Sequence, residues 1–158
     1  MTPRIIQGKE KKLIGQSVLM SLVNNLTGML WSGFMPRRME IENRVGGDFF
    51  SLQVYPPDYH ATFNPAVEFK KLALTEVSNF NHVPEGMEVF TLQGGLYAVF
   101  DSKGASADPS IFQYIYGEWI PKSEYVLDDR PHFEVLGKSY KNNDPNSEEE
   151  IWIPIKKS

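Results

Sequence analysis

The sequence predicts an α+β fold built from two β-α-β-β units within one domain that covers residues 1–158. Stretches in which apolar residues alternate predict strands, and apolar residues three and four apart predict a helix. The same order of elements occurs in about residues 8–80 and again in about residues 86–158. We therefore expect a pseudo-twofold axis, antiparallel sheets, helices on the outer faces and a ligand groove between the halves, because clefts at internal interfaces favour ligands.

The first half begins with a strand and a helix. Residues 13–22 alternate as a strand does, and Asn24-Asn25 can cap the helix that follows. Pro36 should end or kink this helix, because proline cannot donate the N–H that a helix interior needs. The apolar stripe of the helix consists of Leu26, Met29, Leu30, Gly33 and Phe34.

Two further strands complete the first half. The patterns of residues 49–55 and 67–77 predict them, and Pro56-Pro57-Asp58 predicts a turn or loop after the first. Residues 87–100 then open the second half as a strand-rich stretch. Gly94-Gly95 interrupts that stretch and indicates a bulge or a hairpin turn.

The second half continues with a helix and two strands. Asp108-Pro109 is a strong helix start, since aspartate caps the helix and proline is tolerated in its first turn. Pro121 should stop the helix, and strands are expected at 131–137 and 150–155 with a polar loop at 141–146 between them. The helical stripe consists of Phe112, Ile115, Tyr116 and Trp119.

Composition excludes several classes of protein. The hydrophobic fraction of 41% and charged fraction of 23% are typical of a globular protein, and no apolar run approaches the length of a membrane span. Without cysteine there is no disulfide or thiol chemistry, and the cytoplasm is the expected compartment. A net charge of −4 with only short basic clusters, at residues 9–12 and 37–38, argues against direct DNA binding.

The last two strands carry the clearest functional signal. Ile151, Ile153 and Ile155 alternate onto one face, so that Trp152 points to the other. In the preceding strand Glu134 points away from its apolar neighbours. We expect Glu134 and Trp152 to share the front of the sheet, where a carboxylate beside aromatic rings would hold a large, flat, cationic molecule.

Several segments together resemble the GyrI-like small-molecule-binding domain, the same module as the AraC-type effector-binding domain of multidrug-responsive regulators. The resemblance is strongest from about residue 90 to residue 156. These segments are Tyr97-Ala98-Val99-Phe100, Lys103-Gly104, the nine residues from Ile115 to Ser123, Arg130-Pro131-His132-Phe133-Glu134 and the seven residues from Glu149 to Ile155.

The resemblance implies a duplicated β-α-β-β fold and an aromatic cavity with one acidic residue, Glu134, at its base. It also implies a free-standing version, because the first half leaves no room for a helix-turn-helix, with no cofactor. Relatives bind drug-like compounds or gyrase, and others hydrolyse cyclopropane-containing genotoxins. The aromatic candidates for the cavity wall are Trp152, Trp119, Tyr116, Tyr97 and Trp31.

Each candidate has a plainer structural interpretation. Glu134 could lie on a solvated face, paired with Lys138 or Arg130, and packing alone could explain aromatic residues on the helix stripe. Glu118 is most simply a capping or ion-pairing residue. The three histidines are isolated in the sequence, and with no cysteine they give little support to a metal site.

Three functions follow from these residues. The first is binding of an amphipathic, cationic aromatic compound, with Glu134 supplying the charge. The second is hydrolysis of electrophilic drug-like compounds, with Glu134 as acid or base and Tyr97, Tyr116 or Glu118 as the second group. The third is binding to a protein partner, gyrase or a regulator, for which a charge of −4 is modest.

Overall fold

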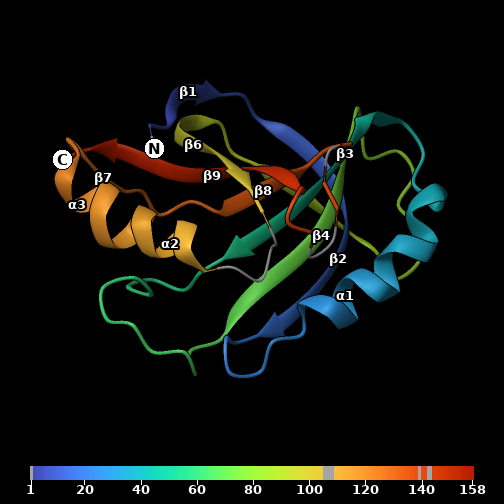
Figure 1. Ribbon diagram of the computed structural model, residues 1–158. Helices are drawn as coiled ribbons and strands as arrows, with labels where there is room; N and C mark the ends of the chain where they lie inside the picture. The colour runs from blue at the N-terminus through green and yellow to red at the C-terminus, as the bar shows by residue number, and fades with distance from the viewer. Residues whose placement is uncertain (1, 105–108, 139, 142–143) are drawn as a thin grey trace.

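A computed structural model describes residues 2–104, 109–138, 140–141 and 144–158 (Figure 1). Within these ranges nine strands form one curled sheet, and two helical segments pack on it. The helical elements are α1 (Thr27–Phe34), η1 (Met35–Glu40), α2 (Ser110–Tyr114), η2 (Ile115–Trp119) and α3 (Ile120–Lys122). The first segment consists of α1 and η1, and the second consists of α2, η2 and α3. The strands are β1 (Arg4–Gly8), β2 (Lys11–Met20), β3 (Arg44–Val54), β4 (Phe69–Val77), β5 (Glu88–Leu92), β6 (Gly95–Lys103), β7 (Tyr125–Leu127), β8 (His132–Leu136) and β9 (Glu148–Lys157).

The expected α+β class is confirmed, but the described strands form one sheet where separate sheets were expected. Their order is β1-β6-β9-β8-β3-β4-β2-β5, and β7 pairs with β9. Antiparallel pairing of β3 with β8 joins the first half of the chain to the second. Outward from this junction, the sheet continues with β4 and β2 on one side and with β9 and β6 on the other. A duplication that relates the two halves remains a prediction.

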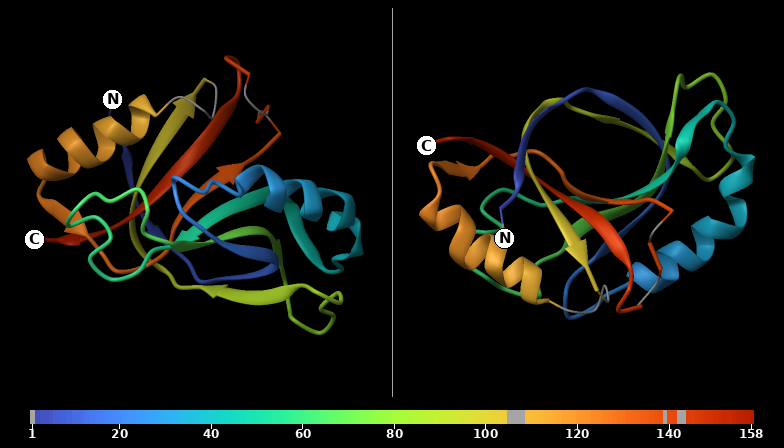
Figure 2. Two further views of the ribbon diagram at one scale, coloured as in Figure 1. Left: turned by 90° about the horizontal axis from the view of Figure 1, so that it is seen from below. Right: turned by 45° about the horizontal axis from the view of Figure 1, so that its top comes forward.

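The sheet curls because the halves exchange strands at its ends. β1 pairs with β6, and β5 pairs with β2, so each half contributes a strand to the other (Figure 2). The inner face of the curl is filled by apolar side chains, whose burial stabilises the curl by about 25 cal/mol for each Å² removed from water. This inner core contains Leu13, Phe50, Leu52, Leu72, Leu74, Leu92, Tyr97, Val99 and Phe133, with Trp152 packed against it.

The helical segments pack on the opposite face of the sheet and lie apart from each other (Figure 2). Leu30 and Phe34 of α1 bury themselves against Ile14 and Ala73, and Ile115 of η2 is buried in a second cluster. That second cluster also contains Ala98, Phe100, Ile151, Ile153 and Ile155. No helix in the described part of the chain is long and apolar enough to cross a membrane.

The prolines act near the helix ends, as expected, but the helices do not stop at them. Pro36 lies at the start of η1, where the chain tightens from an α-helix to a 3₁₀-helix. Pro121 lies in the first turn of α3, and the helix continues only to Lys122. Asp108, the expected cap of the second helix, lies outside the described residues. The short strands β1 and β7 were not predicted.

Gly94-Gly95 joins two strands that pair with different partners, so it forms neither a bulge nor a hairpin turn. Gly95 has φ +148°, and a Cβ at this position would lie 2.5 Å from Nη1 of Arg130. The Arg130 guanidinium forms an ion pair with Asp128 and donates hydrogen bonds to the carbonyls of Leu96 and Ile155. It also lies 4.6 Å from the centre of the Tyr97 ring.

Replacing Gly95 with alanine should therefore lower the free energy of unfolding by about 1–2 kcal/mol, through backbone strain and displacement of the guanidinium. Chemical denaturation measures this change. Gly46→Ala is the matched control, since Gly46 also has a positive φ of 68° but no atom lies within 4 Å of a Cβ there. Equal losses in the two variants would show that the contact with Arg130 contributes nothing.

Candidate functional site

Glu134 lies near the centre of the sheet, on the face that carries the helices. Its Cα partners are Ser51 on β3 and Ile151 on β9. Ile151 belongs to the apolar cluster under α2 and η2, whereas Ala73, which pairs with Ser51, belongs to the cluster under α1. The carboxylate is therefore positioned between the two helix-covered regions, as a groove between the halves requires.

Polar side chains gather along this strip, which we call the polar seam. Lys71, Gln53 and His132 form a continuous row across β4, β3 and β8. Burying such groups is unfavourable unless they find partners, so their concentration in one strip indicates a specialised region. The polar seam comprises Ser51, Gln53, Lys71, Thr75 and His132, all buried, and the half-buried Glu134 and Glu149.

The polar seam contains two carboxylates and one ammonium group. Gln53 donates from Nε2 to Oε2 of Glu134 across 3.1 Å. Burial lowers the pKa of Lys71, while the charges of Glu134 and Glu149 act in the opposite direction. Burial and then the charge of Glu134 raise the pKa of Glu149 to about 7, although Lys71 opposes them. With both carboxylates ionised, negative charge exceeds positive charge by one.

Aromatic rings enclose one end of the polar seam. The Tyr116 hydroxyl lies 2.8 Å from Nδ1 of His132. Burial lowers the pKa of His132 to about 3, with smaller contributions from His60 and Arg130. Burial raises the pKa of Tyr116, and the charge of Glu134 adds to that rise, so both the hydroxyl and the imidazole are neutral at pH 7. Burial likewise raises the pKa of Tyr55.

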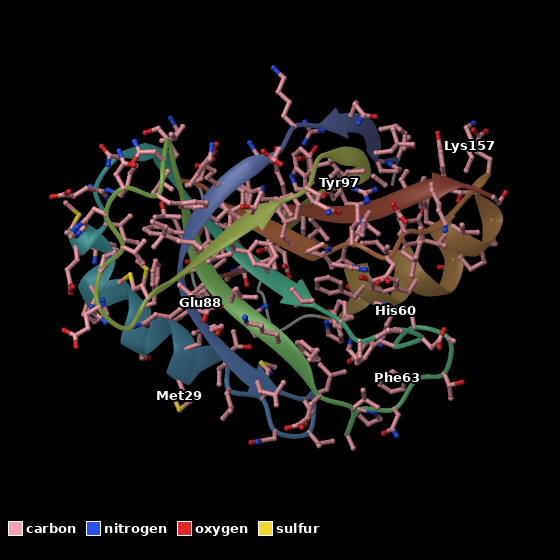
Figure 3. All side chains as sticks on the ribbon, turned by 180° about the vertical axis from the view of Figure 1, so that it is seen from behind. Met29, His60, Phe63, Glu88, Tyr97 and Lys157 are labelled. Atoms are coloured by element: carbon pink, nitrogen blue, oxygen red, sulfur yellow. The ribbon has the colours of Figure 1, made fainter. Side chains whose placement is uncertain are left out.

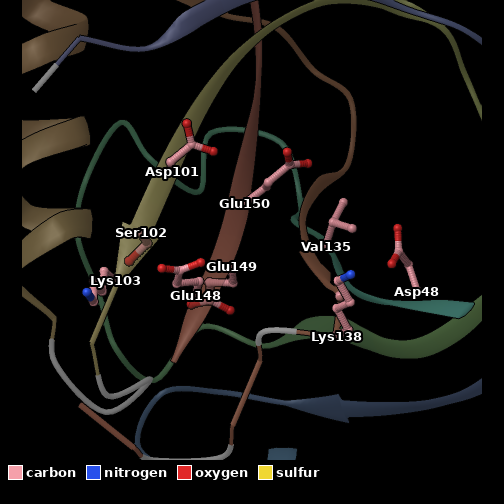
Figure 4. Close-up of a pocket in the computed structure, with 10 residues that line it drawn as sticks. Asp48, Asp101, Ser102, Lys103, Val135, Lys138, Glu148, Glu149 and Glu150 are labelled. Atoms are coloured by element: carbon pink, nitrogen blue, oxygen red, sulfur yellow. The ribbon is translucent and has the colours of Figure 1, made fainter. Parts of the chain in front are cut away.

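Two cavities meet the polar seam at its ends. One, of about 460 Å³, is bounded by residues 55–61 and 126–130 and includes His132. The other, of about 520 Å³, includes Glu149 among a group of acidic side chains (Figure 4). Glu134 lies between these ends and lines neither cavity. The expected placement of its carboxylate at the base of a ligand cavity therefore remains a prediction, and in this structure its Oε2 accepts a hydrogen bond from Gln53.

Trp152 does not share a face with Glu134, so that part of the prediction was wrong. The register pairs Glu134 with Ile151 and Phe133 with Trp152, and the indole stacks on Phe133 at 5.2 Å within the inner core. Its Nε1 donates to Glu150 across 3.1 Å. Tyr97 is also on this inner face, 5.4 Å from Trp152. Neither ring faces the polar seam.

The remaining candidates divide between packing and the site. Trp31 packs edge-on against Phe34 and Phe49 under α1. Trp119 packs against Phe100 and stacks on Tyr125. Glu118 is exposed and pairs with Lys122, and Arg130 pairs with Asp128, so neither of these ion pairs involves Glu134. Of the aromatic candidates Trp152, Trp119, Tyr116, Tyr97 and Trp31, the structure brings Tyr116 to the polar seam.

Sequence reasoning missed several residues of the site. Lys71 offered a signal, because it is a lysine next to the apolar run 72–74 within a predicted strand. Gln53 and Glu149 gave a weaker signal as polar residues within predicted or neighbouring strands. The rings of Tyr55, Tyr59 and His60 carried none, since only the fold brings their loop to η2 and β8.

The helix-flanked polar seam on a curled antiparallel sheet defines an effector-binding type of domain. A model of the Cass2 family, described as integron-associated effector-binding proteins, matches residues 4–155. The chain therefore belongs to this family, and small-molecule binding is its general function. The resemblance to the GyrI-like effector-binding domain is confirmed by this match and by the related folds.

Known proteins of related sequence or fold have diverse descriptions. The transcriptional regulator BrlR of Pseudomonas aeruginosa is 29% identical over 98% of this chain, and the chain spans 56% of that relative's length. SAV2435 bound to tetraphenylphosphonium has a TM-score of 0.70 at 16% identity, covering 99% of this chain and 94% of SAV2435. A hydrolase encoded by lin2189 of Listeria innocua has a TM-score of 0.64 at 10% identity, covering 98% and 92%.

Proposed function

We propose that the protein binds an amphipathic aromatic cation in the polar seam, with Glu134 supplying the complementary charge. The observation that carries this proposal is the position of Glu134 between the two helical segments, with the neutral rings of Tyr55 and Tyr116 close enough for its charge to raise their pKa values. Above pH 7, where Glu149 is ionised as well, one ammonium group, that of Lys71, faces two carboxylates in the polar seam. A positive guest would balance the second.

The chemistry of recognition combines charge with ring stacking. A cation over an aromatic face gains about 0.5–2 kcal/mol, and a desolvated contact with a carboxylate gains more. SAV2435, which has a related fold, was solved with tetraphenylphosphonium, a lipophilic aromatic cation. That likeness supports the same ligand class for this chain, and the similarity to BrlR supports a link to a regulator.

Glu134→Gln should weaken binding of the cationic dye rhodamine 6G at least about tenfold, because a charged hydrogen-bond partner contributes about 1.5–3 kcal/mol. Fluorescence anisotropy of the dye measures the affinity, and calorimetry with tetraphenylphosphonium repeats the test. Glu118→Gln is the matched control, since it removes the same charge from an exposed helix position. Equal affinities for Glu134→Gln and the parent protein would rule out this role of the carboxylate.

A hydrolase is a second candidate, and Glu149 is the observation that favours it. A carboxyl group whose pKa is about 7 can both donate and accept a proton near neutrality, as general acid–base catalysis requires. Glu134 lies close enough for its charge to act on Glu149, whereas Tyr116 lies toward the other end of the polar seam. Tyr97 lies on the other face of the sheet, and Glu118 lies on the outer surface of η2. Mass spectrometry after incubation with a cyclopropane-containing genotoxin tests this candidate. A product heavier by one water, absent with Glu134→Gln, would support it.

The proposed gyrase or regulator partner is tested separately from the ligand. A DNA supercoiling assay with purified gyrase measures inhibition directly, and the net charge of −4 gives little basis for imitation of DNA. Unchanged supercoiling at a protein concentration above that of gyrase would remove gyrase from consideration. It would leave the binding of a cationic compound untouched.

A further inference from the structure

His60 is exposed and packs against four other aromatic rings, which together we call the enclosure. It lies on the loop that follows β3, together with the highly exposed Phe63 (Figure 3). Its imidazole stacks on two rings and meets two others edge-on, so that it covers ring faces that would otherwise be available for stacking. The centroid distances are 4.8 Å to Tyr116, 4.9 Å to His132, 4.8 Å to Tyr55 and 5.0 Å to Tyr59.

The imidazole is nearly parallel to two of these rings, Tyr116 and His132, whose centroids are only 6.0 Å apart and which therefore do not lie on opposite sides of it. The plane of His60 is inclined by 26° to Tyr116 and by 14° to His132. Burial lowers the pKa of His60, so the ring that fills the enclosure is neutral at pH 7. The neutral imidazole therefore covers the faces of the rings but supplies no positive charge to the polar seam.

The four rings adjoin the polar seam. His132 belongs to the polar seam, and the charge of Glu134 reaches both Tyr55 and Tyr116. A flat cation stacked in the place of His60 would face the same rings and lie beside this carboxylate. The rings would then stack on the flat face of the cation, and the carboxylate of Glu134 would balance its positive charge.

The space beside His60 would allow its side chain to move away from the four rings. Part of the imidazole is exposed, and the 460 Å³ cavity begins beside it, between its loop and residues 126–130. Two backbone hydrogen bonds of this turn are local, from the N–H of Tyr59 to the carbonyl of Pro56 and from the N–H of Ala61 to the carbonyl of Asp58. Movement of the imidazole out of the enclosure therefore breaks ring contacts and leaves the sheet intact.

We propose that His60 is an internal placeholder, which fills the aromatic enclosure of an unliganded protein and is displaced when a flat aromatic cation binds. This inference rests on the proposed function and deepens it by naming the stacking subsite and its competitor. A protein whose binding-competent state is only partly populated binds with an affinity reduced by that fraction. His60 therefore lowers the apparent affinity for every ligand that uses the enclosure.

His60→Ala should consequently bind rhodamine 6G more tightly, by about tenfold if His60 fills the enclosure in about nine molecules of ten. A wall residue would have the opposite effect, because its removal would weaken binding. His60→Gln, which keeps a polar side chain but lacks a ring, should also bind more tightly. His82→Ala is the control, since His82 is exposed and forms no part of the enclosure. Fluorescence anisotropy gives the affinities, and thermal denaturation verifies that each variant is folded.

Nuclear magnetic resonance gives a second measurement on the unaltered protein. The pKa of His60 should rise toward its ordinary value when saturating rhodamine 6G is added, because the imidazole leaves the rings that partly desolvate it. An unchanged pKa in the saturated protein, or equal or weaker binding by His60→Ala, would overturn the placeholder. If the parent protein and His60→Ala both fail to bind rhodamine 6G and tetraphenylphosphonium, the proposed function and the placeholder fail together. If the parent binds, Glu134→Gln weakens binding and His60→Ala does not tighten it, only the placeholder fails.

Discussion

Acidification should destabilise this protein because His132 resists protonation in the folded state. The contribution of His132 to the free energy of unfolding should fall by about 3 kcal/mol between pH 6.5 and pH 4. The folded pKa of His132 is about 3, below its ordinary value of 6.5, because the ring is buried beside His60 and Arg130. The unfolded chain therefore binds more protons than the folded protein within this interval. The stabilising effect of the neutral His132 side chain is complete above pH 6.5 and is lost as the pH falls toward 3.

The matched variant is His132→Asn, which can keep a polar atom near the position of Nδ1 and hence near the Tyr116 hydroxyl. Asparagine does not titrate in this range, so urea denaturation should show a shallower loss of stability with acid than in the parent protein. At pH 7 the variant should be less stable by about 1 kcal/mol, since it loses ring contacts. His82→Asn, at an exposed position, serves as the control. Parallel stability curves for the parent and His132→Asn would contradict the assignment.

The individual strands and helices were largely predictable from the sequence, but the long-range strand pairing that closes the sheet was not. Alternation in residues 13–22 and the helical spacing in residues 26–34 both depend on contacts between near neighbours in sequence, and these elements appear close to the expected positions as β2 and α1. β1 (Arg4–Gly8) is short, and its pairing with β6 joins residues more than 85 positions apart. No local pattern specifies such a partner.

The candidate site shows the same division between local and long-range information. The acidic side chain of Glu134 was found because it interrupts an apolar strand. Its supposed neighbour Trp152 was misplaced, because alternation fixes which residues of one strand share a face but not which face of the next strand they meet. The register between β8 and β9 decides this, and it pairs Glu134 with Ile151. Lys71 was missed, although a buried lysine is itself an indication of a functional or paired group.

Glu149 should make the protein less stable as the pH rises, with a sign opposite to that of His132. Its folded pKa of about 7 exceeds the ordinary value of 4.5 because of burial and the charge of Glu134. The folded protein therefore binds more protons than the unfolded chain between pH 4.5 and pH 7, and stability declines across that interval. Since Glu149 is partly exposed, we expect a cost of about 2 kcal/mol above pH 7.

Glu149→Gln should remove this cost, so that the variant is more stable than the parent at pH 8 and nearly equal to it at pH 5. Urea denaturation at the two pH values measures the difference. Glu148→Gln is the control, because Glu148 is the exposed neighbour of Glu149 on β9. Equal stabilisation by Glu149→Gln at pH 5 and pH 8 would show that better packing, and not the charge of Glu149, causes the change.

The same carboxyl group links stability to ligand binding. A cation in the polar seam would favour the ionised form of Glu149, so its binding should release a proton near pH 7 and tighten as the pH rises from 6 to 8. Calorimetry with tetraphenylphosphonium in buffers of different ionisation enthalpy measures the number of protons released. That number should fall toward zero in Glu149→Gln, while Glu148→Gln should release as many as the parent protein. A cation that bound without releasing protons from the parent would lie outside the reach of Glu149, and hence away from this end of the polar seam.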